Sequence, residues 1–184
     1  MTDLSAQLVR DLAGWAAPTA QLQRLRQEYL TFLGDLGGAA LRRDGGAAHV
    51  TASCFILSRN LQQTLLCFHR KGRFWVQTGG HVEPDDRSVP SAALREAREE
   101  AGLVALSLVP GLLDLDRHEL DAGFGSCRTH WDVGFAAVAS TNEAPQVSEE
   151  SVQVAWFSID NLPIPLAGSV APRLLQLRDA VRAG

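Results

Sequence analysis

Cysteine is scarce in this chain, and the few cysteines form no pairing pattern. The 184 residues include three, Cys54, Cys67 and Cys127, which are widely spaced and contain no Cys-x-x-Cys pair. An odd number at such spacing does not indicate a disulfide framework. Cys54 and Cys67 fall within apolar runs, which favours buried free thiols over metal ligands.

Long apolar runs are also missing. No run approaches the roughly 18 residues that a membrane-spanning helix needs. The first residues, Met1 to Leu4, have neither the basic end nor the apolar stretch of a signal peptide. We therefore expect a cytoplasmic protein with no membrane association.

The chain has no excess of positive charge. Lys and Arg number 17 against 21 Asp and Glu, for a formal net charge of -4. Without a domain-wide positive field, general nucleic-acid binding is not expected, whereas a small phosphorylated substrate is compatible with this charge. With 46% apolar and 21% charged residues, the composition is that of an ordinary globular chain with a core.

The most informative stretch runs from residue 79 to residue 103. Leu94, Ala97 and Ala101 recur at helical spacing, and Gly102 follows where a helix would end. In that register Glu96, Glu99 and Glu100 stand at i, i+3 and i+4, on neighbouring positions of one helical face. The helix is predicted to present three mutually repelling carboxylates.

A bound divalent cation would stabilise this cluster better than side-chain pairing does. Arg95 can pair with Glu99, but such a surface pair contributes only about 0.3 to 0.5 kcal/mol. Carboxylates are the ligands that Mg2+ prefers, and a Gly79-Gly80 turn would add a backbone carbonyl. The alternative is a solvated helix face without a ligand.

These residues resemble the signature of the Nudix hydrolase family: Gly, five residues, Glu, seven residues, then Arg-Glu-apolar-x-Glu-Glu-x-Gly-apolar. Residues 95–103 match the second part in full. Two departures precede it. Asp86 stands six residues after Gly80 where the family has Glu, and eight residues, one more than usual, separate Asp86 from Arg95.

The resemblance implies a metal-dependent hydrolase. It implies that Mg2+, with Mn2+ as an alternative, is held by Glu96, Glu99, Glu100 and the Gly80 carbonyl, and that Arg95 orients the glutamates. The implied reaction cleaves a phosphoanhydride in a nucleoside diphosphate linked to another moiety. In this family an acidic residue from a later loop serves as the general base, for which Glu149 and Glu150 are the candidates.

Two other functions on the same fold stay open. One is an enzyme like isopentenyl diphosphate isomerase, which uses a cysteine and a glutamate facing each other across the pocket; Cys67 carries too weak a match for that role. The other is a non-catalytic Nudix module that binds a nucleotide or a protein. The intact glutamate array favours the hydrolase over both.

Outside the motif, the pattern predicts helices at both ends and strands between them. Helices are expected at 4–14, at 19–36 with Thr19 as N-cap, and at 170–181. Strands are expected at 49–57, 64–68, 74–77, 104–109, 113–120, 128–139 and 152–157. This order predicts a three-layer α/β/α sandwich with a mixed sheet, the Nudix architecture.

Residues 1–40 form a helical N-terminal extension that the resemblance does not cover, and residues 47–184 form the Nudix-like domain. The extension can pack on the core, support a homodimer, or cover part of a substrate cleft, and the sequence does not choose between these.

Several cations and histidines are candidate substrate contacts. The basic loop containing Arg70 and Arg73 either binds phosphates or is a solubilising turn. His81 directly follows the two glycines and either approaches the phosphates or makes a structural hydrogen bond. His118, His130 and Asp132 either line a pocket or are hydrogen-bonded residues on a sheet face.

Overall fold

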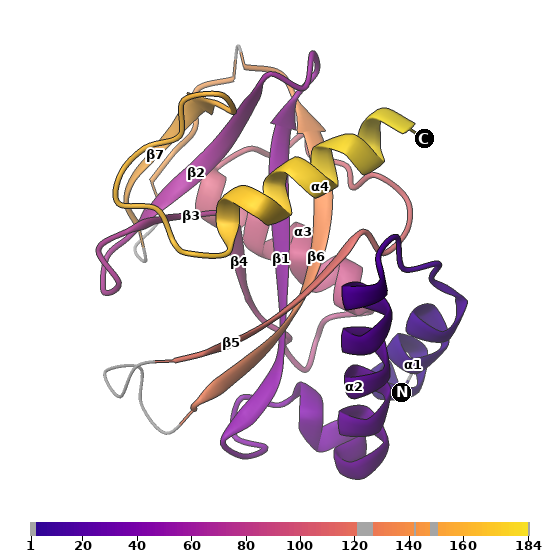
Figure 1. Ribbon diagram of the computed structural model, residues 1–184. Helices are drawn as coiled ribbons and strands as arrows, with labels where there is room; N and C mark the ends of the chain where they lie inside the picture. Colours follow the sequence, from indigo (N-terminus) through magenta and orange to yellow (C-terminus); the bar gives the residue numbers. More distant parts are fainter. Residues whose placement is uncertain (1–2, 121–126, 142, 148–150, 184) are drawn as a thin grey trace.

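The computed structural model describes residues 3–120, 127–141, 143–147 and 151–183. A mixed β-sheet lies between two helical layers (Figure 1). Helix α3 (Val89–Ala101) packs on one face and helix α4 (Val170–Ala183) crosses the other. The predicted three-layer α/β/α sandwich with a mixed sheet is confirmed.

The sheet is built around β1 (Ala48–Ser58), which pairs in parallel with β6 (Thr129–Ala139) along the full length of both strands. The other pairings are antiparallel. Within the described residues, the remaining strands are β2 (Gln63–His69), β3 (Trp75–Val76), β4 (Thr78–His81), β5 (Asp114–Glu119) and β7 (Ser151–Ser158). Strand β4 pairs with β1, and β7 pairs with β2.

Two local predictions were wrong. Residues 104–109 form no strand; Val104 is 84% exposed, and only Leu108 makes an isolated bridge, to Ala137 of β6. Strand β5 occupies residues 129–134 of that edge of β6, and the apolar run meets the remaining part only at Leu108 and Val109, whose amide donates to the Ala136 carbonyl. Gly79 and Gly80 form no turn but lie within β4, opposite Ser53 and Ala52 of β1.

The N-terminal extension is a pair of helices packed on the α3 side of the sheet. Asp3 caps α1 (Leu4–Gly14), and Thr19 caps α2 (Ala20–Leu36), as the sequence predicts for Thr19. A short 3-10 helix, η1 (Gly37–Leu41), then leads into β1. One hydrophobic cluster joins the extension to α3 and the sheet; its members include Leu8, Leu12, Leu33, Ala52, Ala97 and Val133.

On the opposite face, α4 covers a second hydrophobic cluster and a buried polar network. Arg173 of α4 donates to the carboxylates of Asp114 and Asp132, and Thr51 and Ser53 of β1 also donate to Asp132. Asp132, a candidate pocket residue in the sequence, is therefore a hydrogen-bonded residue of the sheet face. In the described part of the chain, no helix is both long and apolar enough to cross a bilayer.

Candidate active site

The acidic helix α3 is defined at both ends by its own sequence. Ser88 caps its N-terminus in a reciprocal capping box with Ser91, and a proline stands in the first turn. At the C-terminal end Gly102 adopts a left-handed conformation with a φ of 65°, which glycine takes without strain. These local signals fix the register of the three glutamates.

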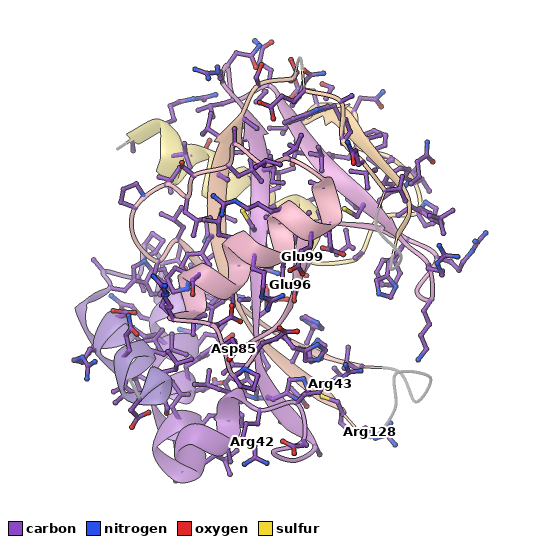
Figure 2. All side chains as sticks on the ribbon, turned by 180° about the vertical axis from the view of Figure 1, so that it is seen from behind. Arg42, Arg43, Asp85, Glu96, Glu99 and Arg128 are labelled. Atoms are coloured by element: carbon purple, nitrogen blue, oxygen red, sulfur yellow. The ribbon has the colours of Figure 1, made fainter. Side chains whose placement is uncertain are left out.

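The three glutamates of α3 face the same region of the molecule but differ in exposure. Figure 2 shows Glu96 and Glu99 on the same side of the helix. Arg95 Nη1 donates to the Glu96 carboxylate at 3.0 Å and to the Glu99 carboxylate at 3.2 Å. Glu100 is buried and its Oε2 accepts the amide hydrogen of Gly79 at 2.8 Å. The Glu99 side chain remains 57% exposed.

Asp86 makes the supporting contact of the acidic loop despite its shorter side chain. Its two carboxylate oxygens accept from Arg95 Nε at 3.1 Å and from Arg95 Nη2 at 3.0 Å, a bidentate pair. The Asp86 hydrogen bond is the main cause that raises the pKa of Arg95. The loop, one residue longer than in the Nudix signature, thus lets an aspartate, one methylene shorter than the expected glutamate, contact the guanidinium of Arg95.

Strand β4 presents its backbone to α3. The Gly79 amide donates to Glu100, and the His81 carbonyl accepts from Arg95 Nη2. In an antiparallel pair, one residue directs both its N–H and its C=O at the partner strand, and the next residue directs both away from it. Gly79 and His81 therefore direct their backbone groups away from β1, the Gly79 amide to Glu100 and the His81 carbonyl to Arg95, whereas Gly80 faces β1.

The donor atoms are of the kind that a hard divalent cation prefers. A Cβ on Gly80 would collide with the Glu96 carboxylate, so only glycine allows that carboxylate to lie against the strand. Glu96 and Glu100 supply carboxylate oxygens beside the backbone of β4, and Arg95 holds the Glu99 carboxylate near that of Glu96.

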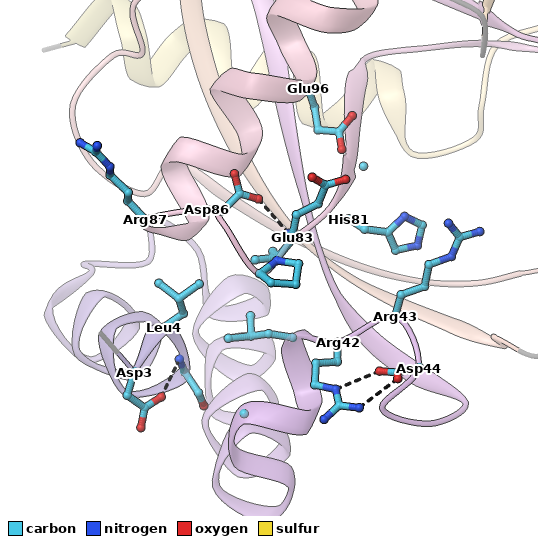
Figure 3. A pocket seen from close by; sticks show the side chains of 16 residues that line it. Asp3, Leu4, Arg42, Arg43, Asp44, His81, Glu83, Asp86, Arg87 and Glu96 are labelled. Carbon is cyan, nitrogen blue, oxygen red and sulfur yellow. Dashed lines mark hydrogen bonds and ion pairs between the residues drawn. The ribbon is translucent and has the colours of Figure 1, made fainter. Parts of the chain in front are cut away.

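A cleft of about 1350 Å³ opens beside Glu96 and Gly80, and the N-terminal extension forms one of its walls (Figure 3). From that side come Leu4, Gly38 and Leu41, followed by the cations Arg42 and Arg43. Arg42 is paired with Asp44, whereas the Arg43 side chain extends beside His81. Of the roles left open for the extension, the structure gives it both core packing and a wall of this cleft.

Three histidines lie together next to the cleft. The ring centroids of His49 and His81 are 4.9 Å apart, and those of His49 and His130 are 5.0 Å apart. Burial, reinforced by neighbouring positive groups, lowers the pKa of His81 to about 4 and that of His130 to about 3. Both imidazoles are therefore neutral at neutral pH.

The structure does not gather every predicted site residue. Neither Arg70 nor Arg73 lines the cleft, and Arg73 instead stacks over the Phe68 ring with 5.4 Å from Cζ to the ring centroid. Glu149 and Glu150 lie outside the described residues. Sequence reasoning missed Arg43 and His49, because no local motif links them to the acidic helix.

Comparison with known proteins agrees with the fold and the motif. A family model described as NUDIX domain matches residues 47–177. None of the curated proteins is significantly similar in sequence.

Solved structures share the architecture at low sequence identity. The C. elegans Ap4A hydrolase binary complex aligns with a TM-score of 0.61 at 18% identity, over 73% of this chain and 98% of that one. The E. coli dihydroneopterin triphosphate pyrophosphohydrolase aligns with a TM-score of 0.61 at 17% identity, over 71% and 95%. The NUDIX domain of Shewanella oneidensis NrtR, complexed with ADP ribose, aligns with a TM-score of 0.57 at 21% identity, over 72% and 87%. These likenesses establish a common fold.

Proposed function

Because this chain belongs to the Nudix family, we propose that it is a metal-dependent pyrophosphohydrolase acting on a nucleoside diphosphate linked to another moiety. The observation that carries the proposal is the gathering of three glutamates of one helix around two adjacent glycines of β4. Glu96 lies against Gly80, Glu100 accepts from the Gly79 amide, and Arg95 holds Glu96 and Glu99 together.

In this proposal Glu96, Glu99 and Glu100 hold Mg2+, or Mn2+ in its place. When bound, such an ion neutralises phosphate charge and makes water a stronger acid. The Gly80 carbonyl stays the predicted backbone ligand, and the Gly79 carbonyl is a second candidate because the Gly79 amide already points to Glu100 of α3. Arg95 positions the carboxylates, and Asp86 positions Arg95. Glu149 and Glu150 stay predictions for the general base.

The substrate would occupy the cleft between α3 and the N-terminal extension. Its volume of about 1350 Å³ accommodates a nucleotide derivative. Arg43 and His81 border it and can contact phosphate oxygens, Arg43 by charge and His81 as a neutral hydrogen-bond donor. Arg70, Arg73 and His130 do not line this cleft and stay predictions as substrate contacts. The homodimer and the cytoplasmic location also stay predictions.

The isomerase alternative lacks support at its cysteine. Cys67 is 1% exposed, and its Sγ lies 4.0 Å from the backbone carbonyl of Glu100. A thiol in that environment does not face the cleft, and Cys54 is completely buried as well. No specific observation supports the non-catalytic alternative. A module without catalysis would not need all three carboxylates, and this chain retains them.

Glu99→Gln tests the hydrolase. The substitution removes one carboxylate charge from an exposed position, so we expect the fold to be retained and kcat to fall about 30-fold or more, about 2 kcal/mol in barrier. Phosphate or nucleotide release is measured with Mg2+ on the best substrate. Glu143→Gln, at another exposed glutamate, is the matched control and should retain wild-type kcat. A Glu99→Gln rate within threefold of wild type contradicts the metal assignment.

The best substrate comes from a panel of nucleoside triphosphates, dinucleoside polyphosphates, nucleotide sugars, NAD and coenzyme A, each with Mg2+ or Mn2+. Nucleotide binding measured by calorimetry without any turnover across this panel would instead favour the non-catalytic module.

A further inference from the structure

A group of side chains of the types that ligate metals lies on the face of the sheet opposite to α3. His49 of β1 and His130 of β6 are direct partners in the parallel ladder, which places their imidazoles side by side. Cys127 enters just before β6, and its Sγ lies 3.5 Å from His49 Nδ1. One ligand atom from each of the three residues lies within 4.8 Å of the others.

We propose that His49, Cys127 and His130 bind a transition-metal ion of zinc-like preference, at a site separate from the glutamates of α3. Two imidazoles and a thiolate are the donors of zinc and related borderline-soft ions, whereas Mg2+ prefers oxygen. The two sites therefore select different ions.

The observed spacing suits this assignment. In tetrahedral zinc sites, bonds of about 2.3 Å to sulfur and about 2.0 Å to nitrogen place these two ligand atoms roughly 3.5 Å apart. The distance between Cys127 Sγ and His49 Nδ1 already matches. Atoms separated by up to 4.8 Å must approach by as much as about 1.5 Å, and His130, which is only half-buried, has room to turn.

His49 lacks a strong hydrogen-bond partner, which is the second reason for the proposal. The residue is 1% exposed, so its imidazole is buried. Among the described residues, the Cys127 thiol alone lies within hydrogen-bonding distance of its ring nitrogens. A thiol is a weak partner for a buried imidazole, and a metal ion would satisfy the ring nitrogen instead.

Binding at this site should release one proton. Each imidazole binds a metal ion through the lone pair of one ring nitrogen in its neutral form. The Cys127 thiol lies 3.6 Å from the carbonyl oxygens of Ala47 and Thr129, to which it can donate. The metal–sulfur bond forms as the S–H bond breaks, and the proton passes to solvent.

Cobalt is the appropriate probe because a thiolate ligand gives Co2+ a charge-transfer absorption band in the near ultraviolet. The full-length protein is titrated with Co2+ in excess Mg2+, so that the glutamates of α3 are occupied. We expect the band to saturate at one Co2+ per chain, and Zn2+ to displace the cobalt. Calorimetry in two buffers of different ionisation enthalpy should give about one proton released per ion.

Variants locate the site. Cys127→Ser should abolish the band, and His130→Asn should weaken Co2+ binding at least tenfold. His118→Asn is the matched control; its ring lies 5.4 Å from that of His130 but pairs with Asp116, so affinity should stay within threefold of wild type. Circular dichroism shows whether each variant is folded. If Cys127→Ser does not fold, the Co2+ affinity of His130→Asn tests the proposal instead.

Three results would overturn the proposal. They are a wild-type protein without the band in excess Mg2+, a band of unchanged intensity in folded Cys127→Ser, and His130→Asn binding Co2+ as tightly as wild type. None of these readouts depends on hydrolytic activity.

Discussion

Arg95 is the residue that holds the acidic cluster in one arrangement. A single guanidinium donates to Asp86, Glu96 and Glu99 and to the His81 carbonyl. Each of these contacts involves a charged donor, which makes it stronger than a neutral hydrogen bond. Arg95 keeps carboxylates that repel one another close together before any cation binds.

The first prediction concerns Asp86. Asp86→Asn removes the charge from the bidentate pair, so Arg95 and the glutamates that it contacts become less ordered. We expect kcat to fall about tenfold, about 1.4 kcal/mol in barrier, and the half-maximal rate to require a higher Mg2+ concentration than in the wild type. Steady-state kinetics at varied Mg2+ provides the measurement. Asp85→Asn, at the exposed neighbouring position, is the control, and equal rates for both variants would argue against a positioning role for Asp86.

At the scale of elements, α2 belongs to the same core as the Nudix sheet. The Phe32 ring stacks on Trp131 of β6 at 4.5 Å between centroids, and Tyr29 meets the same indole edge-on at 4.9 Å. The Tyr29 hydroxyl reaches the backbone carbonyls of Asp116 and Asp132, at 2.8 and 2.7 Å. Helix α2 therefore packs against β5 and β6 through both apolar and polar contacts.

This packing predicts cooperative unfolding of the extension with the domain. Leu33 is 2% exposed and Leu36 is 40% exposed on the same helix. Leu33→Ala should lower the free energy of unfolding by about 2 to 5 kcal/mol in a single transition, because it leaves a cavity in the shared core. Leu36→Ala should cost less than about 0.5 kcal/mol. Denaturant unfolding is followed by tryptophan fluorescence and circular dichroism; separate transitions for the two probes would mean that the extension folds independently.

At the scale of the whole molecule, Tyr29 reports on global folding because it is the single tyrosine of the chain. Burial raises the pKa of its phenol well above 10, and the neighbouring Asp132 carboxylate raises it further. Loss of its proton is therefore disfavoured while α2 is packed on the sheet. Ionisation of this residue is thus linked to unfolding.

The expected pH dependence follows from that linkage. Above the unfolded-state pKa of about 10, the unfolded chain releases the phenolic proton while the folded protein retains it, so stability falls as pH rises. Absorbance of phenolate near 295 nm should stay flat in the native protein through pH 10 and rise together with the loss of circular dichroism. An increase centred near pH 10 in protein that remains folded would show that the phenol is accessible.

The sequence by itself determined the features that depend on neighbouring residues. The Thr19 cap of α2, the Gly102 end of α3 and the apolar spacing of the helices, and with them the common face of Glu96, Glu99 and Glu100, follow from contacts within a few positions. The Nudix family followed from the same nine-residue match. Helical register is set locally, so these predictions were confirmed.

Only the tertiary structure decided the features that depend on strand pairing and helix docking. The placement of Gly79 and Gly80 in a strand, the lack of a strand at 104–109, and the pairing of Asp86 with Arg95 each depend on which segment lies alongside. The parallel register of β1 with β6 brings His49 to His130 across 81 positions of the chain. No local spacing encodes that meeting, because it is fixed by how the whole sheet pairs and by the core that holds it in register.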